Sequence, residues 1–324
     1  MAADIAFHLA PACKGGQALT GWNRKRTKIS RTRYLLNASQ PVMTRKTIAR
    51  ETTAEGIALH AGQTVRMTLK PAPAGQGIVF RRTDLAREIP ARYDHVAETR
   101  LGTVIARDGA SVGVIEHLMA AIAGAELDDL VVELDGPEPP ILDGDALSYL
   151  ALLDRAGTQT NDAPRPALKI LKPVTVQSGE ARATLHPAEG FGFDFEIVFP
   201  SPAIGRQMFH WPFAPETFRR EIAPARTFGF LHELDALNKA GLGRGASLEN
   251  TLAIDGDKVV NAALMRFPDE FVRHKILDAL GDLALAGFPL IARFEGIRSG
   301  HALNNALLRA LFADSSNYAR MTPK

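Results

Sequence analysis

The spacing of hydrophobic positions predicts two long amphipathic helices. Over residues 271–287, apolar side chains recur at the spacing of one helical face: Ile276, Leu277, Leu280 and Leu283. Residues 112–124 show the same spacing: Ile115, Leu118, Met119 and Ile122. Each stretch ends in Ala-Gly, where a glycine commonly closes a helix. Both helices are therefore expected to bury one face.

Shorter apolar runs bounded by Gly and Pro predict strands. In the first half they cover residues 65–69, 78–82 and 130–134, and in the second half residues 168–176, 181–186, 191–199 and 289–294. Further helices are expected over residues 145–156 and 301–312. Residues 158–166 carry Asn161, Asp162, Pro164 and Pro166 with little apolar content, and are interpreted as a linker.

The order of predicted elements repeats, which favours an α+β fold of two similar domains. We expect a first domain at residues 43–160 and a second at residues 161–324. The second half carries extra apolar material at about residues 231–257, around a glycine-rich turn at 241–245. That turn lacks the preceding strand and the third glycine of a dinucleotide fingerprint. If the domains face each other, His117 and His274 of the two main helices meet in one cleft.

Composition narrows the class of protein. The 324 residues are 46% hydrophobic and 23% charged, which is typical of a folded globular protein, and the formal charge of +2 gives no reason to expect a nucleic-acid partner. No apolar run approaches the length of a membrane span. The single cysteine, Cys13, excludes an intramolecular disulfide and fits the reducing cytoplasm.

Residues 1–42 are basic and poor in acids. This composition suits a transit-like peptide, a nucleic-acid arm or an upstream extension without a role. We favour an extension that is disordered, with Met43 as the natural start, because strand-like alternation begins directly after Met43.

His274 and Asp278 are four residues apart, so they project from one helical face and can bind one divalent metal. The alternative is an ordinary surface hydrogen bond on an amphipathic helix. The pair Glu116-His117 suggests a third ligand beside a general base, although a glutamate at a helix start also stabilises the helix dipole.

Three ligands, His117, His274 and Asp278, leave zinc one open position for water, as catalytic sites require. Two histidines and a carboxylate also suit a non-haem Fe(II) oxygenase, whose ligands normally lie on strands. His301 follows a glycine at the start of the last predicted helix and is a candidate proton donor to the leaving amine. A helix N-terminus lowers its pKa and a carboxylate such as Asp282 raises it, and an ordinary helix-start residue is the alternative.

Four motifs together resemble one family. They are Ile-Glu-His-Leu at 115–118, Ala-Arg-Thr-Phe-Gly-Phe at 225–230, the segment 271–282, and Ser-Gly-His-Ala-Leu-Asn at 299–304. In this order they resemble the UDP-3-O-acyl-N-acetylglucosamine deacetylases, zinc enzymes of the committed step of bacterial lipid A synthesis, over residues 43–317. The resemblance implies two α+β domains of similar topology, each a two-layer α/β sandwich with an insert, and an active site at their junction.

The resemblance also implies roles for individual residues. His117, His274 and Asp278 become the zinc ligands, Glu116 the general base, and His301 the general acid or an electrostatic stabiliser. Thr227 would hydrogen-bond the developing oxyanion. The residues expected to serve the substrate or support the site are Phe228, Lys275, Asp282 and Arg298, with Asp282 orienting His301 and Arg298 suited to phosphate oxygens.

The resemblance further implies that the apolar insert forms the passage for the 3-O-acyl chain. Its expected lining is Leu234, Leu237, Leu242, Ser247, Leu248 and Leu252. Each buried methylene of such a chain contributes about 0.8 kcal/mol, which favours long-chain substrates. Gly243 stands where many members of the family carry a larger side chain, and Leu248 stands where some carry an aromatic one, which bears on chain-length preference. His60 matches a family motif but is interpreted as a hydrogen-bonded structural histidine.

The sequence thus predicts a cytoplasmic, monomeric zinc amidohydrolase whose partner is the UDP-linked acyl sugar, with transient membrane-surface contact allowed and no nucleic-acid partner. Two rivals are an Fe(II) oxygenase and a non-catalytic protein that binds a sugar nucleotide or a lipid.

Overall fold

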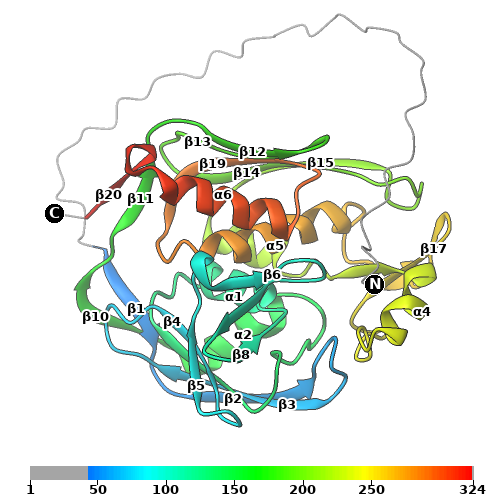
Figure 1. Ribbon diagram of the computed structural model, residues 1–324, viewed down its shortest axis with the longest axis horizontal. Helices are drawn as coiled ribbons and strands as arrows, with labels where there is room; N and C mark the ends of the chain where they lie inside the picture. Colours follow the sequence, from blue (N-terminus) through cyan, green and yellow to red (C-terminus); the bar gives the residue numbers. More distant parts are fainter. Residues whose placement is uncertain (1–42, 323–324) are drawn as a thin grey trace, which may run out of the picture. The chain divides into compact units, whose positions relative to one another are not determined.

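The structure is a computed structural model that describes residues 43–322. The predictions for residues 1–42 lie outside the described residues. Within residues 43–322 the fold is mixed α/β, as predicted, and it contains two large sheets with helices between them (Figure 1).

The first large sheet has five strands in the order β2-β3-β9-β4-β5. Its strands are β2 (Thr52–Ile57), β3 (Thr64–Pro71), β4 (Ile78–Arg82), β5 (Arg87–Pro90) and β9 (Leu130–Leu134). In this sheet only β4 and β9 pair parallel, and parallel strands need a long crossover connection such as the one that joins them. That connection contains η1 (Tyr93–His95), the small sheet β6 (Val96–Glu98), β7 (Val104–Arg107) and β8 (Ala110–Val112), and helix α1 (Glu116–Gly124). Helix α2 (Leu147–Ala156) follows β9.

The second large sheet has seven strands, with β12-β13-β19-β11-β20 in order and β14 joining β15 to β19. The strands are β11 (Ala167–Ile170), β12 (Val174–Ser178), β13 (Ala181–His186), β14 (Phe191–Val198), β15 (Arg206–Pro212), β19 (Leu290–Ile297) and β20 (Tyr318–Met321). Helices α5 (Glu270–Ala284) and α6 (His301–Ala313) lie on one face of this sheet, and η4 (Ser315–Asn317) precedes β20 (Figure 1).

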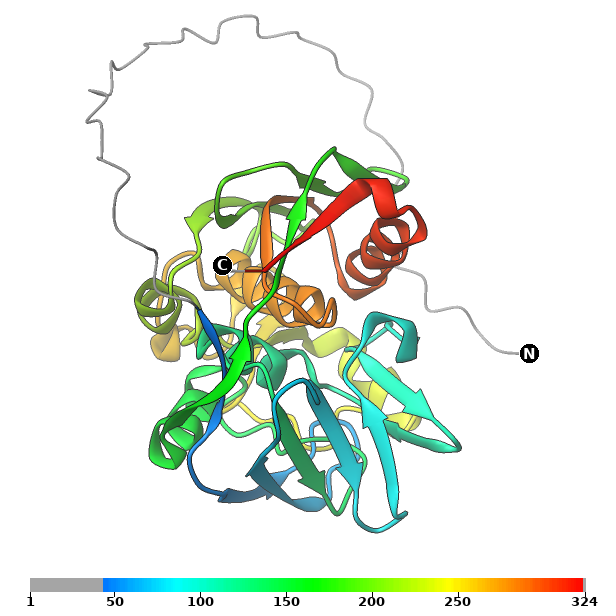
Figure 2. The ribbon, with the colours of Figure 1, turned by 90° about the vertical axis from the view of Figure 1, so that its left-hand side faces the viewer.

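The helices of the two sheets face each other. α1 and α2 lie on the side of the first sheet that is turned toward α5 and α6, so the sheets are outside and the helices inside (Figures 1 and 2). α1 packs directly on α5. The buried core runs through these layers and includes Tyr149, Trp211 and Phe294.

The predicted insert is a small βαβ unit at one side of the helical layer (Figure 1). Strand β16 (Phe228–Phe230) leads into α4 (Leu231–Lys239), and β17 (Leu252–Asp255) returns parallel to β16 before β18 (Lys258–Val259). The short helices α3 (Pro215–Thr217), η2 (Phe218–Ile222) and η3 (Ala262–Leu264) flank this region. No helix in residues 43–322 is long and apolar enough to cross a membrane.

The interpretation of residues 158–166 as a linker is wrong. β10 (Thr158–Pro164) pairs antiparallel with β1 (Thr44–Ile48). Backbone hydrogen bonds pair β10 with β1, and β1 supplies the buried Ile48, so β10 forms although its own sequence has little apolar content. The adjoining Arg165 is buried and binds Asp128 through its Nε at 2.8 Å.

Several boundaries also differ from the prediction. The first main helix begins at Glu116, because Val112 ends β8 and Val114 turns the chain with a φ of 54°. Gly124 is the last helical residue rather than a cap. Position 124 requires glycine because an added Cβ would lie 2.1 Å from the Phe218 ring. The predicted strand 168–176 is two strands, β11 and β12, separated by a segment that contains Pro173.

Candidate active site

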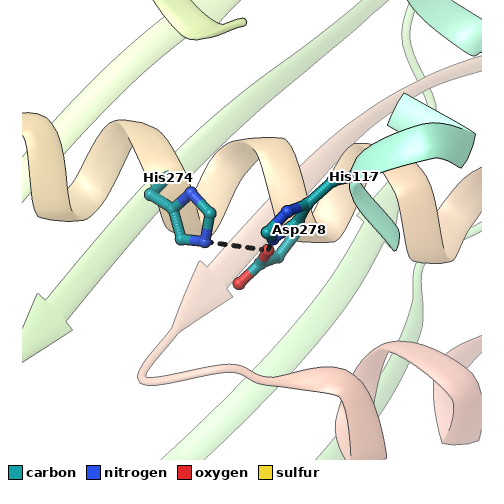
Figure 3. Close-up of side chains that lie close together, drawn as sticks. All are labelled: His117, His274 and Asp278. Carbon is teal, nitrogen blue, oxygen red and sulfur yellow. Dashed lines mark ion pairs between the residues drawn. The ribbon is translucent and has the colours of Figure 1, made fainter. Parts of the chain in front are cut away.

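Helices α1 and α5 bring the three predicted metal ligands together. His117 is the second residue of α1, and His274 and Asp278 lie one turn apart on α5 (Figure 3). One ligand atom from each of the three lies within 4.8 Å of the others. The Oδ1 atom of Asp278 is 3.3 Å from Nε2 of His274 and 3.5 Å from Nε2 of His117.

Gly281 allows the two helices to approach this closely. A Cβ at position 281 would lie 2.0 Å from the carbonyl oxygen of Glu116. The backbone of α1 therefore rests on α5 where α5 has no side chain, one residue before His117. Any larger residue would have to separate the helices and move His117 away from His274 and Asp278.

The donor set fits a divalent cation. Within residues 43–322, Nδ1 of His117 and Oδ1 of Asp278 are buried without a hydrogen-bond partner. Buried polar atoms are rarely left unsatisfied in this way, so the unpaired Oδ1 of Asp278, which faces Nε2 of both histidines, indicates a ligand between the three residues. Two imidazoles and a carboxylate are typical zinc ligands.

His274 is prepared to act as a neutral ligand. Its Nδ1 lies 3.0 Å from the carbonyl oxygen of Ala225, which fixes the proton on Nδ1 and leaves the lone pair of Nε2 directed at Asp278. Burial lowers the pKa of His274 to about 3, so the imidazole is neutral at physiological pH.

Asp278 is held in its charged form. Burial opposes ionisation, but the neighbouring His274 and Lys275 lower the pKa of Asp278 well below its usual range. The Nζ atom of Lys275 donates to Oδ2 of Asp278 at 2.7 Å, which leaves Oδ1 free for a cation. The structure thus places the predicted substrate residue Lys275 against a predicted ligand.

Glu116 is buried beside the three candidate ligands, with His301 as a nearby cationic side chain. The backbone N–H of Thr103 donates to its Oε2 at 2.9 Å, and Nε2 of His301 lies 3.9 Å from its Oε1. Burial raises the pKa of Glu116. A carboxylate with a raised pKa next to a cation site has the properties of a general base.

His301 is oriented by Asp282, as predicted. The Nδ1–H of His301 donates to Oδ2 of Asp282 at 2.8 Å, and Nε2 points toward Glu116 and toward Oδ2 of Asp278 at 4.0 Å. Burial lowers the pKa of His301, but the carboxylates of Asp282 and Glu116 raise it by more than burial lowers it. The net effect is a pKa of about 9. The imidazole is therefore protonated at neutral pH.

Two residues that sequence reasoning missed hold Asp282. The Oγ1–H of Thr103 donates to Oδ1 of Asp282 at 2.5 Å, and Nδ2 of Asn304 donates to its Oδ2 at 2.8 Å. Asn304 stands in the motif that contains His301, three residues further along α6, so the motif could have suggested it. No signal in the sequence connects Thr103 to this site.

The remaining predicted residues, Phe228, Thr227 and Arg298, differ in their contacts with this cluster. Phe228 packs near His274, with ring centroids 6.1 Å apart. Thr227 precedes it, and its backbone N–H donates to the carbonyl of Gly144 at 2.9 Å. Arg298 binds Oε2 of Glu180 at 2.5 Å, so its guanidinium is engaged with a carboxylate.

The predicted acyl-chain residues all belong to the insert. Leu234 lies on α4, partly buried, and its Cδ1 would be 3.8 Å from a Cβ at Gly243. Leu242 donates its N–H to the carbonyl of Leu237. Ser247 and Leu248 are exposed on the following loop, where Ser247 Oγ accepts the N–H groups of Glu249 and Asn250. The structure groups these residues in one unit but records no contact from them to the metal ligands.

Comparison with known proteins agrees with this geometry. A family model described as LpxC, UDP-3-O-acyl N-acetylglycosamine deacetylase, matches residues 45–313. A protein of Phenylobacterium zucineum (strain HLK1) is 51% identical over 262 residues, covering 80% of this chain and 89% of the relative. One of Myxococcus xanthus (strain DK1622) is 48% identical over 275 residues, covering 84% and 88%. Both are named UDP-3-O-acyl-N-acetylglucosamine deacetylase.

Together with the family match, the mixed α/β fold and the buried glutamate and histidine beside a candidate cation site identify the class of protein as a hydrolytic enzyme. More specifically, the chain belongs to the LpxC family of UDP-3-O-acyl N-acetylglycosamine deacetylases.

Proposed function

We propose that this enzyme, which removes the N-acetyl group of UDP-3-O-acyl-N-acetylglucosamine in lipid A biosynthesis, uses a zinc ion held by His117, His274 and Asp278. The observation that carries the proposal is the buried cluster of His117, His274 and Asp278, in which Oδ1 of Asp278 has no hydrogen-bond partner and lies close to Nε2 of both histidines. Bound zinc supplies Lewis-acid activation of water and of the amide carbonyl.

Glu116 and His301 divide the proton transfers in this proposal. Glu116 removes a proton from the attacking water, because it is buried next to the ligands and has a raised pKa. His301 gives a proton to the leaving amine nitrogen from Nε2, since Asp282 holds its Nδ1 and keeps the ring protonated. Thr227 donates a hydrogen bond to the oxyanion, which stabilises charge that develops only in the transition state.

The substrate's two ends are assigned to different parts of the chain. We infer that the insert, with Leu234, Leu242, Ser247 and Leu248, receives the acyl chain. Phe228, Lys275, Asp282 and Arg298 support the sugar and the diphosphate, and binding of phosphate requires Arg298 to exchange Glu180 for the ligand.

We also propose that the chain is divided near residue 160 into two α+β domains, each a sheet layered with helices, with the site at their junction. The arrangement of two sheets around a shared helical layer supports this division. We further propose a cytoplasmic monomer that has no nucleic-acid partner and contacts the membrane surface only transiently.

Acetate release from UDP-3-O-acyl-N-acetylglucosamine, measured with and without a chelator, tests the metal proposal. We expect turnover to stop on metal removal and to return with one equivalent of zinc, as measured by metal analysis. Activity that survives complete removal of metal would contradict the proposal. Dioxygen consumption with Fe(II) would instead favour the oxygenase chemistry.

A further inference from the structure

The turn between β2 and β3 connects the insert to the loop that precedes β7. Within this turn, Nε2 of His60 lies 3.0 Å from the carbonyl oxygen of Leu101, and the N–H of Gly243 donates to Nδ1 of His60 at 3.3 Å. Because Nδ1 accepts, the proton of the neutral ring is on Nε2, which donates to Leu101. One imidazole thus joins two segments that are far apart in sequence.

Both sides of this connection are firmly held. The buried carboxylate of Glu138 accepts the backbone N–H groups of His60 and Ala61 at 2.8 and 3.0 Å. On the insert side, the N–H of Gly245 donates to the carbonyl of Leu59 at 2.9 Å. A Cβ at Gly245 would lie 2.3 Å from the carbonyl oxygen of Ala58, so the insert loop can only dock this closely with glycine there.

The loop on the other side leads directly to the acid–base groups. Gly102 follows Leu101, and a Cβ at position 102 would lie 2.8 Å from Oε1 of Glu116. Thr103 then binds Glu116 through its backbone N–H and Asp282 through its hydroxyl. A shift of Leu101 therefore moves the groups that position Glu116 and Asp282.

We propose that His60 is a specificity-determining positioning residue that couples occupation of the insert to the placement of Glu116 and Asp282. The inference rests on the proposed role of the insert in binding the acyl chain. Leu234 and Leu237 lie 3.8 Å from the Cβ position of Gly243, so a chain packed on them orders the loop that His60 holds. His60 transmits this order to Leu101, and a long-chain substrate is deacetylated faster for that reason.

Three substitutions separate the two hydrogen bonds. In His60→Asn, the amide oxygen occupies the region of Nδ1 and keeps the bond to Gly243, but the side chain is too short to reach Leu101. In His60→Gln, the amide nitrogen occupies the region of Nε2 and keeps the bond to Leu101 while losing Gly243. His60→Leu loses both. His210→Leu is the matched control, because His210 is exposed on β15.

The readout is kcat and KM for UDP-N-acetylglucosamine with and without a long 3-O-acyl chain. In all three His60 variants, the ratio of kcat/KM for the acylated substrate to kcat/KM for the substrate without the chain should fall about fivefold. This is the effect expected from one hydrogen bond. His60→Gln should retain more kcat than His60→Asn on the substrate without the chain, because its Leu101 loop stays anchored. His210→Leu should keep the wild-type preference.

Other outcomes contradict the coupling. If the three His60 variants lower kcat/KM by the same factor for both substrates, His60 has only a structural role. If His60→Asn retains as much kcat as His60→Gln, the Leu101 bond does not position the site. Failure of the proposed function looks different, since wild-type enzyme would then show no preference for the acylated substrate at all.

Discussion

Glu116 and His301 are two buried titratable side chains whose environments favour opposite charge states. Burial raises the pKa of Glu116, whereas the carboxylates of Asp282 and Glu116 raise the pKa of His301 against the effect of burial. A cation on His117, His274 and Asp278 would favour the charged form of Glu116 and oppose that of His301. At the scale of single residues, the cation therefore prepares a base while Asp282 maintains an acid.

Replacing Glu116 by Gln tests the base. The amide keeps the size and the hydrogen bond from Thr103 but cannot take a proton, so we expect kcat to fall about 10²- to 10⁴-fold. Zinc content should be unchanged, because Glu116 is not among the ligands. Acetate release and metal analysis measure both quantities, with Glu216→Gln, on an exposed carboxylate, as control. Wild-type activity in Glu116→Gln would remove Glu116 from the mechanism.

The pH dependence tests the acid. In its proposed role His301 acts while protonated, and its pKa of about 9 predicts that activity is present at neutral pH and falls as the pH rises through the pKa of His301. A bound cation adds positive charge and moves this alkaline limb below 9. In His301→Ala the limb should disappear from the profile of kcat/KM, together with most of kcat. A profile that keeps the same alkaline limb would assign it to another group.

Thr103 provides a third test at the residue scale. Thr103→Val keeps the shape and the backbone N–H bound to Glu116, but leaves Oδ1 of the buried Asp282 without its donor. An unsatisfied buried acceptor costs about 1 to 3 kcal/mol, so we expect kcat to fall about tenfold with zinc content unchanged. Thr103→Ser should restore most of kcat. Equal loss in Val and Ser variants would mean that shape, not the hydroxyl, matters.

The sequence identified the side chains that the structure brings together in the candidate site better than the residues that support them. His274 and Asp278 follow from helical spacing, and the structure places both beside His117. Thr103 could not be predicted, because its partner Asp282 is 179 positions away and only the packing of α1 on α5 brings them together. Asn304 was within reach, since it lies in the motif of His301.

At the scale of elements, the site depends on how α1 crosses α5. The helical periods were predicted correctly, but periodicity reports which face is buried and not what it meets. The helices cross at Gly281, where the backbone of α1 at Glu116 lies against α5. Gly281 belongs to the segment 271–282, but the sequence predicted no role for it. The linker prediction failed because side-chain pattern also does not report backbone pairing, and β10 is held by backbone pairing with β1.

Gly281→Ala tests the crossing. Its Cβ would lie 2.0 Å from the Glu116 carbonyl oxygen, so α1 must move and His117 must move with it. We expect zinc affinity and kcat to fall at least tenfold, and stability to fall by about 1 to 3 kcal/mol through overpacking. Gly190→Ala is the control, because no atom lies within 4 Å of its Cβ position and its φ is negative. Unchanged metal affinity in Gly281→Ala would show that the helices can separate without disturbing the ligands.

Among the contacts in residues 43–322 that join the part before residue 160 to the part after it, two bear on how the whole enzyme responds to a bound metal. One is the β1–β10 ribbon, extended by Arg165, which binds Asp128 and Glu126. The other is the helical layer, where the candidate metal ligands come from α1 on one side and α5 on the other. A metal bound there links the two parts through side chains.

Metal removal should therefore lower the stability of the whole enzyme. A ligand that binds only the folded state stabilises it by RT ln(1 + [L]/Kd), about 2.7 kcal/mol when free zinc is 100 times Kd. We expect the thermal midpoint, followed by circular dichroism, to fall by several degrees in chelator and to recover with zinc, as one transition because both helices hold the ion. His117→Ala should melt at the same temperature with and without zinc. A metal-dependent midpoint in His117→Ala, or separate transitions in which only one part responds to zinc, would show that the ion does not join α1 to α5.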